Sequence, residues 1–195
     1  MSFENFKSYF RLDMSQTPAM IVFDLDSCIW TPEMYQTAGK PFSTDGKTGN
    51  VRCKNGTIVR LMGDVREILS ELRTEMLYKD SIIAIASRGD SAGSEMGWAD
   101  DCLSKFRIGA ELDIPLITLF HQKEIYAKNK KNHFEALKRK SKVEYSEMIF
   151  FDDKLYNLRD VAKLGVTCVY TPHGITRKIW KEGMDQFPRP GQIIK

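Results

Sequence analysis

The sequence has 195 residues, of which 42 % are hydrophobic and 28 % charged, with a formal net charge of +3. These values exclude an intrinsically disordered chain and suit one globular domain with a sizeable core. No apolar run reaches the ~20 residues that span a bilayer, and residues 1–16 lack the apolar segment of a signal peptide. We therefore expect a cytoplasmic protein without a membrane or nucleic-acid partner.

Short apolar runs along the chain predict the strands of a parallel sheet. Runs of this length without alternation are typical of strands that are covered on both faces. Each run is followed by polar residues or by a turn. The predicted strands are 19–23, 81–86, 116–120, 148–151 and 166–170.

Helical patterns lie between several of these runs, over 64–77, 132–140 and 155–164. The first begins with Asp64 and Glu67 in a capping-box spacing, and Gly165 follows the third in the usual position after a helix end. Strands that alternate with helices predict an α/β, doubly wound, mostly parallel sheet. In such sheets the active site lies beyond the carboxyl ends of the strands.

Residues 31–61 are polar and contain Asn55-Gly56 between two alternating segments, which predicts a β-hairpin. We interpret this stretch as a flap inserted into a single domain of residues 1–195, too short for a large cap domain. The tail after residue 183 is polar, contains two prolines and is expected to be loosely ordered.

Acidic pairs follow two of the predicted strands. Asp24 and Asp26 come directly after residues 19–23, and Asp152 and Asp153 follow residues 148–151. Either pair alone fits a solvated turn. Together at one sheet edge they would concentrate negative charge, which a divalent cation removes, and carboxylate oxygens suit magnesium.

A hydroxyl and a basic segment complete the candidate site. Ser87 ends the predicted strand 81–86, where its hydroxyl can bind a phosphoryl oxygen. A lysine beside bound phosphate would neutralise the negative charge on the transferring phosphoryl group. The residues themselves do not distinguish among four candidates, which are Lys123, Lys128, Lys130 and Lys131.

The order of these pieces resembles the haloacid-dehalogenase (HAD) superfamily, and more closely its eukaryotic magnesium-dependent phosphatase family of the acid phosphatase type. The resemblance covers residues 20 to 183. It is carried by Phe23-Asp-Leu-Asp26, Trp30, Ala84-Ile-Ala-Ser-Arg88, Lys123-Glu-Ile-Tyr126, His133-Phe134, Phe150-Phe-Asp-Asp153 and Leu164-Gly-Val-Thr-Cys168. It also selects Lys130 as the lysine of the site.

The resemblance implies an aspartyl-phosphate mechanism with Mg²⁺ as cofactor. Asp24 would be the nucleophile and Asp26 the general acid and base. Asp24, Asp153 and the carbonyl of Asp26 would bind the metal, and Asp152 would support them. Phosphate and substrate contacts are expected from Leu25, Ser87, Arg88 and Lys130.

Cys28 departs from the family pattern, which usually has a threonine at this position. A thiol is a weaker hydrogen-bond donor than a hydroxyl. Its expected place beside a metal would favour the thiolate, so we expect inhibition by thiol oxidants that a Cys28→Thr variant resists.

Two alternatives to a phosphatase fit parts of the pattern. One is a phosphoacceptor receiver domain, although there the lysine comes last in the sequence, whereas Lys130 precedes Asp152 and Asp153. The other is an inactive binding protein with the same fold, which only Cys28 favours.

The short flap predicts an open site. An open site can accept a phosphorylated protein or a small molecule, and the resemblance implies phosphotyrosine or sugar phosphates, hence protein tyrosine phosphatase activity. Trp30 and Tyr35 could either pack in the core or stack on a planar leaving group. We expect the protein to act as a monomer.

Overall fold

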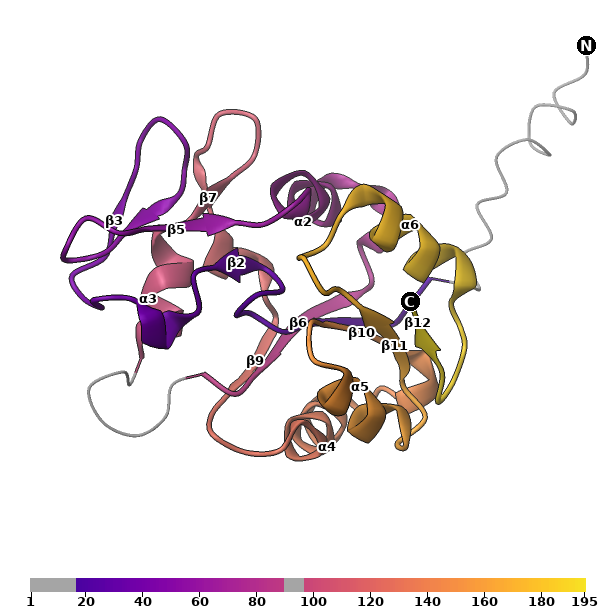
Figure 1. Ribbon diagram of the computed structural model, residues 1–195. Helices are drawn as coiled ribbons and strands as arrows, with labels where there is room; N and C mark the ends of the chain where they lie inside the picture. The colour runs from indigo at the N-terminus through magenta and orange to yellow at the C-terminus, as the bar shows by residue number, and fades with distance from the viewer. Residues whose placement is uncertain (1–16, 90–96) are drawn as a thin grey trace, which may run out of the picture.

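The computed structural model describes residues 17–89 and 97–195. A parallel sheet of six strands forms the centre of the molecule, in the order β12-β11-β10-β1-β6-β9 (Figure 1). The predicted α/β class and the predicted strands 19–23, 81–86, 148–151 and 166–170 are confirmed. The strands are β1 (Met20–Phe23), β6 (Ile82–Ser87), β9 (Gln122–Ile125), β10 (Met148–Asp152), β11 (Thr167–Tyr170) and β12 (Ile193–Ile194).

The register of the central strands determines where the polar side chains meet. Phe23 at the end of β1 lies beside Phe151 of β10 and beside Ile85 of β6. The next residue, Asp24, therefore comes level with the ends of both neighbours. Because parallel strands share one carboxyl edge, the polar residues after each strand converge there.

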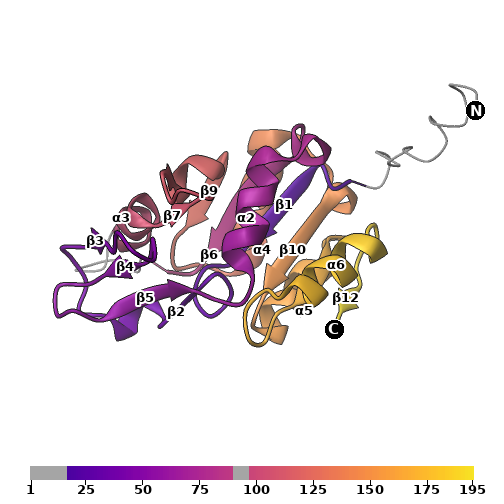
Figure 2. The ribbon, with the colours of Figure 1, turned by 90° about the horizontal axis from the view of Figure 1, so that it is seen from above.

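Helices cover the two faces of the sheet, which alternate along each strand. On one face α2 (Val65–Thr74) and α6 (Arg177–Gln186) cover Ile21 and Phe23 of β1. On the other face α4 (Lys130–Ser141) and α5 (Leu155–Ala162) cover Met20 and Val22. Both views show this three-layer arrangement (Figures 1 and 2).

The flap insertion forms a small antiparallel sheet in the order β2-β5-β4-β3. Its strands are β2 (Trp30–Thr31), β3 (Ser43–Thr44), β4 (Val51–Arg52) and β5 (Ile58–Leu61), and a short 3-10 helix, η2, spans Met34–Gln36. The antiparallel pairing of β4 with β5 confirms the predicted hairpin. With α3 (Trp98–Lys105), β7 (Arg107–Ile108) and β8 (Ile114–Pro115), this sheet lies at the end of the molecule away from α6 (Figures 1 and 2).

The insertion shares the hydrophobic core of the main sheet. Trp30, Val51 and Val59 are fully buried and belong to the same cluster as Phe23 and Ile85. The insertion therefore packs as part of the molecule rather than as a separately folded cap.

Two sequence predictions about secondary structure are wrong. Residues 116–120 are not a strand, because Leu116–Leu119 form the 3-10 helix η4, with the two leucines buried three residues apart. The strand is β9, immediately afterwards, whose polar sequence conceals it because it lies at the sheet edge. The predicted helix 64–77 ends at Thr74, and the 3-10 helix η3 (Met76–Tyr78) follows.

The tail after residue 183 is ordered, in contrast to the expectation. Helix α6 continues to Gln186, and β12 then pairs in parallel with β11. Ile194 is buried against the core, so a short apolar ending outweighs the polar composition of the tail. Within the described residues, no helix has the length and apolar character that crossing a membrane requires.

Candidate active site

A cavity of about 420 Å³ opens at the carboxyl edge of the central sheet. The ends of β1, β6 and β10, the start of α4 and the η2 turn of the insertion all contribute to its walls. The lining residues are Asp24, Asp26, Glu33, Met34, Tyr35, Ser87, Arg88, Gly89, Lys130, Asp153, Lys154, Tyr156 and Asn157.

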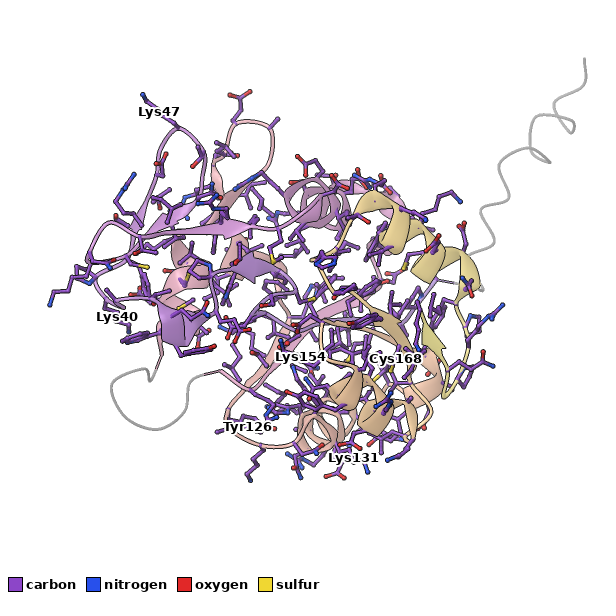
Figure 3. The ribbon with its side chains drawn as sticks, viewed as in Figure 1. Lys40, Lys47, Tyr126, Lys131, Lys154 and Cys168 are labelled. Carbon is purple, nitrogen blue, oxygen red and sulfur yellow. The ribbon has the colours of Figure 1, made fainter. Side chains whose placement is uncertain are left out.

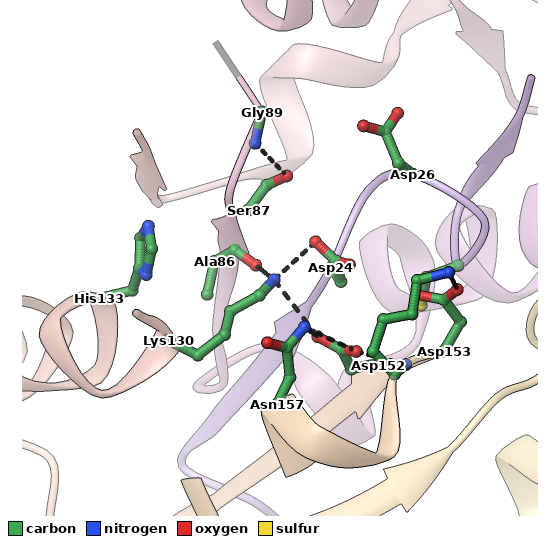
Figure 4. Close-up of polar contacts among 12 residues, drawn as sticks. Asp24, Asp26, Ala86, Ser87, Gly89, Lys130, His133, Asp152, Asp153 and Asn157 are labelled. Atoms are coloured by element: carbon green, nitrogen blue, oxygen red, sulfur yellow. Dashed lines mark hydrogen bonds and ion pairs between the residues drawn. The ribbon is translucent and has the colours of Figure 1, made fainter. Parts of the chain in front are cut away.

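Lys130 connects the ends of three strands at the floor of this cavity (Figure 4). Its ammonium lies 2.6 Å from Oδ1 of Asp24 and 3.3 Å from Oδ2 of Asp152, and it donates to the carbonyl of Ala86. The side chain is 1 % exposed. Burial alone would lower the pKa of Lys130, but the charges of Asp24 and Asp152 raise it, so the ammonium stays charged.

The other three candidate lysines do not reach the site. Lys123 pairs with Asp100, Lys128 is exposed, and Lys131 lies on the outer part of α4 (Figure 3). The geometry thus separates Lys130 from neighbours of the same chemistry.

His133 helps to set the start of α4. Its ring nitrogens lie 3.1 Å from the carbonyl oxygen of Asn129 and 3.0 Å from that of Tyr126, and the ring stacks on Tyr126. Burial and the charge of Lys130 lower its pKa. The histidine therefore connects the loop before α4 to the first turn of that helix.

Asp26 lies on the opposite side of the cavity from Lys130 (Figure 4). Its Oδ1 accepts hydrogen bonds from Nε1 of Trp30 at 2.6 Å and from the amide of Met34 at 2.9 Å. The pKa of Asp26 is raised to about 6, chiefly by burial and also by the charge of Asp24, while the hydrogen bond from Trp30 opposes the rise. A carboxyl with such a pKa can both give and take a proton near neutral pH.

Trp30 therefore does not line the substrate entrance, although the sequence left this open. It is fully buried and stacks on Phe106 with ring centroids 5.8 Å apart. Tyr35 does line the cavity and is 64 % exposed. Tyr156, at the start of α5, is a second exposed aromatic residue there, which the sequence analysis did not identify.

The predicted phosphate-binding residues lie around the same cavity with one exception. Ser87 is buried at the end of β6, where its Oγ accepts a hydrogen bond from the amide of Gly89 at 3.3 Å, and Arg88 is exposed at the rim. The side chain of Leu25 packs in the core instead. Its backbone N–H has no hydrogen-bond partner among residues 17–89 and 97–195, so the amide is the group that Leu25 offers to a phosphoryl oxygen.

Asp152 is fully buried and fully occupied by protein donors. The amide of Lys154 bonds its Oδ1 at 2.7 Å, and Nδ2 of Asn157 contacts both oxygens, at 3.1 and 3.0 Å. Burial and the charge of Asp24 raise the pKa of Asp152 to about 7, while Lys130 lowers it. Asn157 was missed by the sequence analysis; its signal is a polar residue on the apolar face of α5.

Asp153 leaves one oxygen without a partner. Its Oδ2 lies 2.7 Å from the ammonium of Lys154, whereas Oδ1 is buried and, in the described part of the chain, receives no hydrogen bond. Ligand oxygens of Asp24, Asp152 and Asp153 lie within 4.8 Å of one another, and the Asp26 carboxylate is not in this group. Three clustered carboxylates with an unsatisfied buried oxygen fit a hard divalent cation.

Cys28 lies in a different environment from the one expected. The thiol is fully buried, donates to the carbonyl of Phe151 at 3.5 Å and accepts from Oγ1 of Thr171 at 3.4 Å. Burial and then the charge of Asp24 raise its pKa well above the usual range. Burial and the neighbouring carboxylate of Asp24 therefore oppose the expected thiolate.

Comparison with known proteins shows the family of this chain. The acid phosphatase family model matches residues 16–189. The chain belongs to the acid phosphatase family. It is 33 % identical over 176 residues to the human protein called magnesium-dependent phosphatase 1, covering 90 % of each chain. It is also 30 % identical over 152 residues to a HAD-like hydrolase superfamily protein of Schizosaccharomyces pombe, covering 77 % of this chain and 83 % of the relative.

Solved structures agree on the fold of this acid phosphatase family member. A HAD-superfamily hydrolase of Ehrlichia chaffeensis aligns with a TM-score of 0.56 at 12 % identity, over 89 % of this chain and 99 % of the other. A haloacid-dehalogenase-like hydrolase of Xanthomonas campestris aligns with a TM-score of 0.54 at 12 % identity, over 83 % and 86 %. The family and the fold establish a phosphatase of the HAD type.

Proposed function

We propose that this phosphatase hydrolyses phosphomonoesters with Mg²⁺, through a phosphoryl group carried on Asp24. The observation that supports this most directly is the placement of Asp24 at the cavity floor, with one oxygen 2.6 Å from buried Lys130 and with Asp26 lining the same cavity. The family membership and the name of the human relative agree with it.

Asp24 and Asp153, with the backbone carbonyl of Asp26, would hold the metal. When bound, Mg²⁺ offsets the negative charge of the carboxylates and of the phosphoryl oxygens. Asp152 acts indirectly, because its own oxygens are already bonded to Asn157 and Lys154. Its charge helps to hold Lys130 in the position that also contacts Asp24.

In the first step a carboxylate oxygen of Asp24 attacks phosphorus and the bond from phosphorus to the leaving oxygen breaks. Asp26 in its acid form gives its proton to that oxygen. In the second step the Asp26 carboxylate takes a proton from water. The water oxygen bonds to phosphorus, the bond to Asp24 breaks, and phosphate leaves. Lys130, Ser87 and the Leu25 amide contact the phosphoryl oxygens during both steps.

We further propose that the substrate presents its phosphate on an extended body. The rim carries exposed Tyr35 and Tyr156 and the cation of Arg88, which suit an aromatic or sugar leaving group. Phosphotyrosine and sugar phosphates are the proposed substrate classes. We also propose that the chain acts as a cytoplasmic monomer, and as a single domain because the insertion shares the hydrophobic core of the main sheet.

Turnover of an aryl phosphate tests this function. The protein should release phosphate with Mg²⁺, lose activity in a chelator and regain it when Mg²⁺ is restored. Asp24→Asn should be inactive while its circular dichroism is unchanged, since an amide of the same size cannot attack phosphorus. Near-normal hydrolysis by Asp24→Asn would exclude the covalent mechanism. Absence of turnover by the unaltered protein would favour a receiver or an inactive binding protein.

A further inference from the structure

We propose that Lys154, held by Glu33 of the insertion, positions Asp153 as a metal ligand and so links the insertion to Mg²⁺ binding. This inference rests on the proposed function, because it concerns the same metal site. It assigns a role to two charged residues that line the cavity but take no part in the steps described above.

The first observation is that the two carboxylate oxygens of Asp153 have different surroundings. Lys154 occupies Oδ2 at 2.7 Å, and Oδ1 is buried and receives no hydrogen bond from any residue that the structure describes. A carboxylate fixed at one oxygen presents the other in a defined direction. Outer partners of this kind orient metal ligands and restrict their rotation.

The second observation is that Lys154 is itself held from two sides. Its backbone amide donates to Oδ1 of Asp152 at 2.7 Å, which fixes the main chain just before α5. Its ammonium lies 3.6 Å from Oε1 of Glu33, and the same oxygen accepts a hydrogen bond from Oγ of Ser27 at 3.0 Å. A connected set of polar contacts therefore runs from the Ser27 hydroxyl through Glu33 and Lys154 to Asp153.

The third observation is the position of Glu33 in the chain. It precedes η2, whose first residue, Met34, donates its amide to Oδ1 of Asp26. One turn of the insertion thus contacts Asp26 directly and Asp153 through Lys154. When this turn packs in its observed position, it would orient the carboxylates of Asp26 and Asp153 at the same time.

The charge of Lys154 could instead oppose a neighbouring metal ion. Its side chain is 42 % exposed, so solvent screens this repulsion, whereas the side chain of Asp153 is only 6 % exposed. Orientation of Asp153 should therefore outweigh repulsion. Loss of orientation would weaken Mg²⁺ binding when Lys154 is replaced, whereas loss of repulsion would strengthen it, so the change in affinity tests the proposal.

Isothermal titration of the metal-free full chain with MgCl₂ measures the effect without turnover. Lys154→Met should weaken Mg²⁺ binding about 10- to 100-fold, the usual range for loss of an outer partner. Lys154→Arg should restore most of the affinity, because it keeps a cation beside Asp153. Lys163→Met is the matched control: Lys163 pairs with Asp160 on the surface and should not affect binding.

Glu33→Gln tests the link to the insertion. It should weaken Mg²⁺ binding in the unaltered background and have no further effect in Lys154→Met, since Glu33 acts through that lysine. Thermal unfolding in a chelator should give similar midpoints for all variants, which separates positioning from loss of structure.

Equal or tighter Mg²⁺ binding by Lys154→Met would overturn the inference and leave the proposed function intact. Equal effects of Glu33→Gln in both backgrounds would overturn the link to the insertion. If the unaltered protein binds no Mg²⁺, both the inference and the proposed function fail.

Discussion

The indole of Trp30 donates a hydrogen bond to Oδ1 of Asp26 over 2.6 Å, and Met34 donates its amide to the same oxygen. With two donors directed at Oδ1, a proton on Asp26 is carried by Oδ2. In the proposed mechanism Asp26 delivers this proton to the leaving group. Trp30 and Met34, at the start of the insertion, therefore determine how Asp26, the proposed general acid, is oriented.

We predict that Trp30→Phe shifts the pH profile of the first step. The pKa of Asp26 is raised to about 6 chiefly by burial, even though the Trp30 hydrogen bond lowers it. Loss of that hydrogen bond should therefore raise the pKa of Asp26 further. The first step needs protonated Asp26, and kcat/KM therefore falls as pH rises through the pKa. The falling limb of kcat/KM for an aryl phosphate should move to higher pH in Trp30→Phe.

Trp180→Phe is the matched control, because it removes a buried indole that stacks on Phe151, outside the cavity. Ionisation of the substrate is common to all the proteins and cancels in the comparison. An unshifted limb in Trp30→Phe would show that this hydrogen bond does not tune Asp26.

A second prediction concerns stability. Lys130→Met should lower the free energy of unfolding of the metal-free protein by about 3–5 kcal/mol at pH 8, since it leaves Asp24 and Asp152 buried without their cation. The loss should shrink as pH falls. Burial and Asp24 already raise the pKa of Asp152 to about 7, and removing Lys130 raises it further, so protonation at acidic pH relieves the penalty.

Urea unfolding at pH 8 and pH 5.5 in a chelator measures both effects. Lys138→Met removes a surface pair with Glu144 and should change stability by about 1 kcal/mol or less at either pH. A loss for Lys130→Met that grows at acidic pH would contradict the assignment.

A third prediction replaces the expected oxidant sensitivity of Cys28. All four cysteines are buried, and the pKa of Cys28 is raised by burial. The native protein should keep its activity in mild peroxide and react slowly with N-ethylmaleimide. Cys28→Thr can still donate to Phe151 and accept from Thr171, so it should keep its activity in peroxide as the unaltered protein does. Rapid loss of activity in the unaltered protein alone would restore the original expectation.

The fourth prediction concerns the leaving group. We expect comparable kcat/KM for an aryl phosphate and a phosphotyrosine peptide, and lower values for free nucleotides. Tyr35→Ala should reduce kcat/KM for the aromatic substrates about 2- to 12-fold, the worth of one aromatic contact. Met76→Ala, an equally exposed apolar side chain outside the cavity, should have no effect. A strong preference for one small metabolite, with no action on the peptide, would indicate that the insertion closes over the substrate.

The features that the sequence predicts well are those that depend on neighbouring residues. The acidic pairs can be placed because each directly follows an apolar strand, and parallel strands end at one edge. The hairpin can be placed because Asn55-Gly56 permits a tight turn. Asp24 and Asp153 lie close together in the structure, as their positions directly after two parallel strands imply.

Features that depend on long-range packing are less predictable. Lys130 differs from Lys131 only in which side of a helix start faces the sheet, and the sequence of a basic segment does not encode that by itself. Trp30 is equally suited to a core or to a binding surface until Phe106 is known to stack on it. The position of Lys154 between Asp153 and Glu33 joins segments 120 residues apart.

The two edge strands of the central sheet bear on how the protein behaves at high concentration. An exposed strand edge can pair with another molecule and start aggregation, and short or charged edge strands reduce that risk. On one side β9 carries Lys123 and Glu124; on the other, β12 has only two residues and covers β11. Removing residues 190–195 would make β11, with Cys168 and Val169, the new edge. A truncated form should therefore self-associate where the full chain remains dispersed.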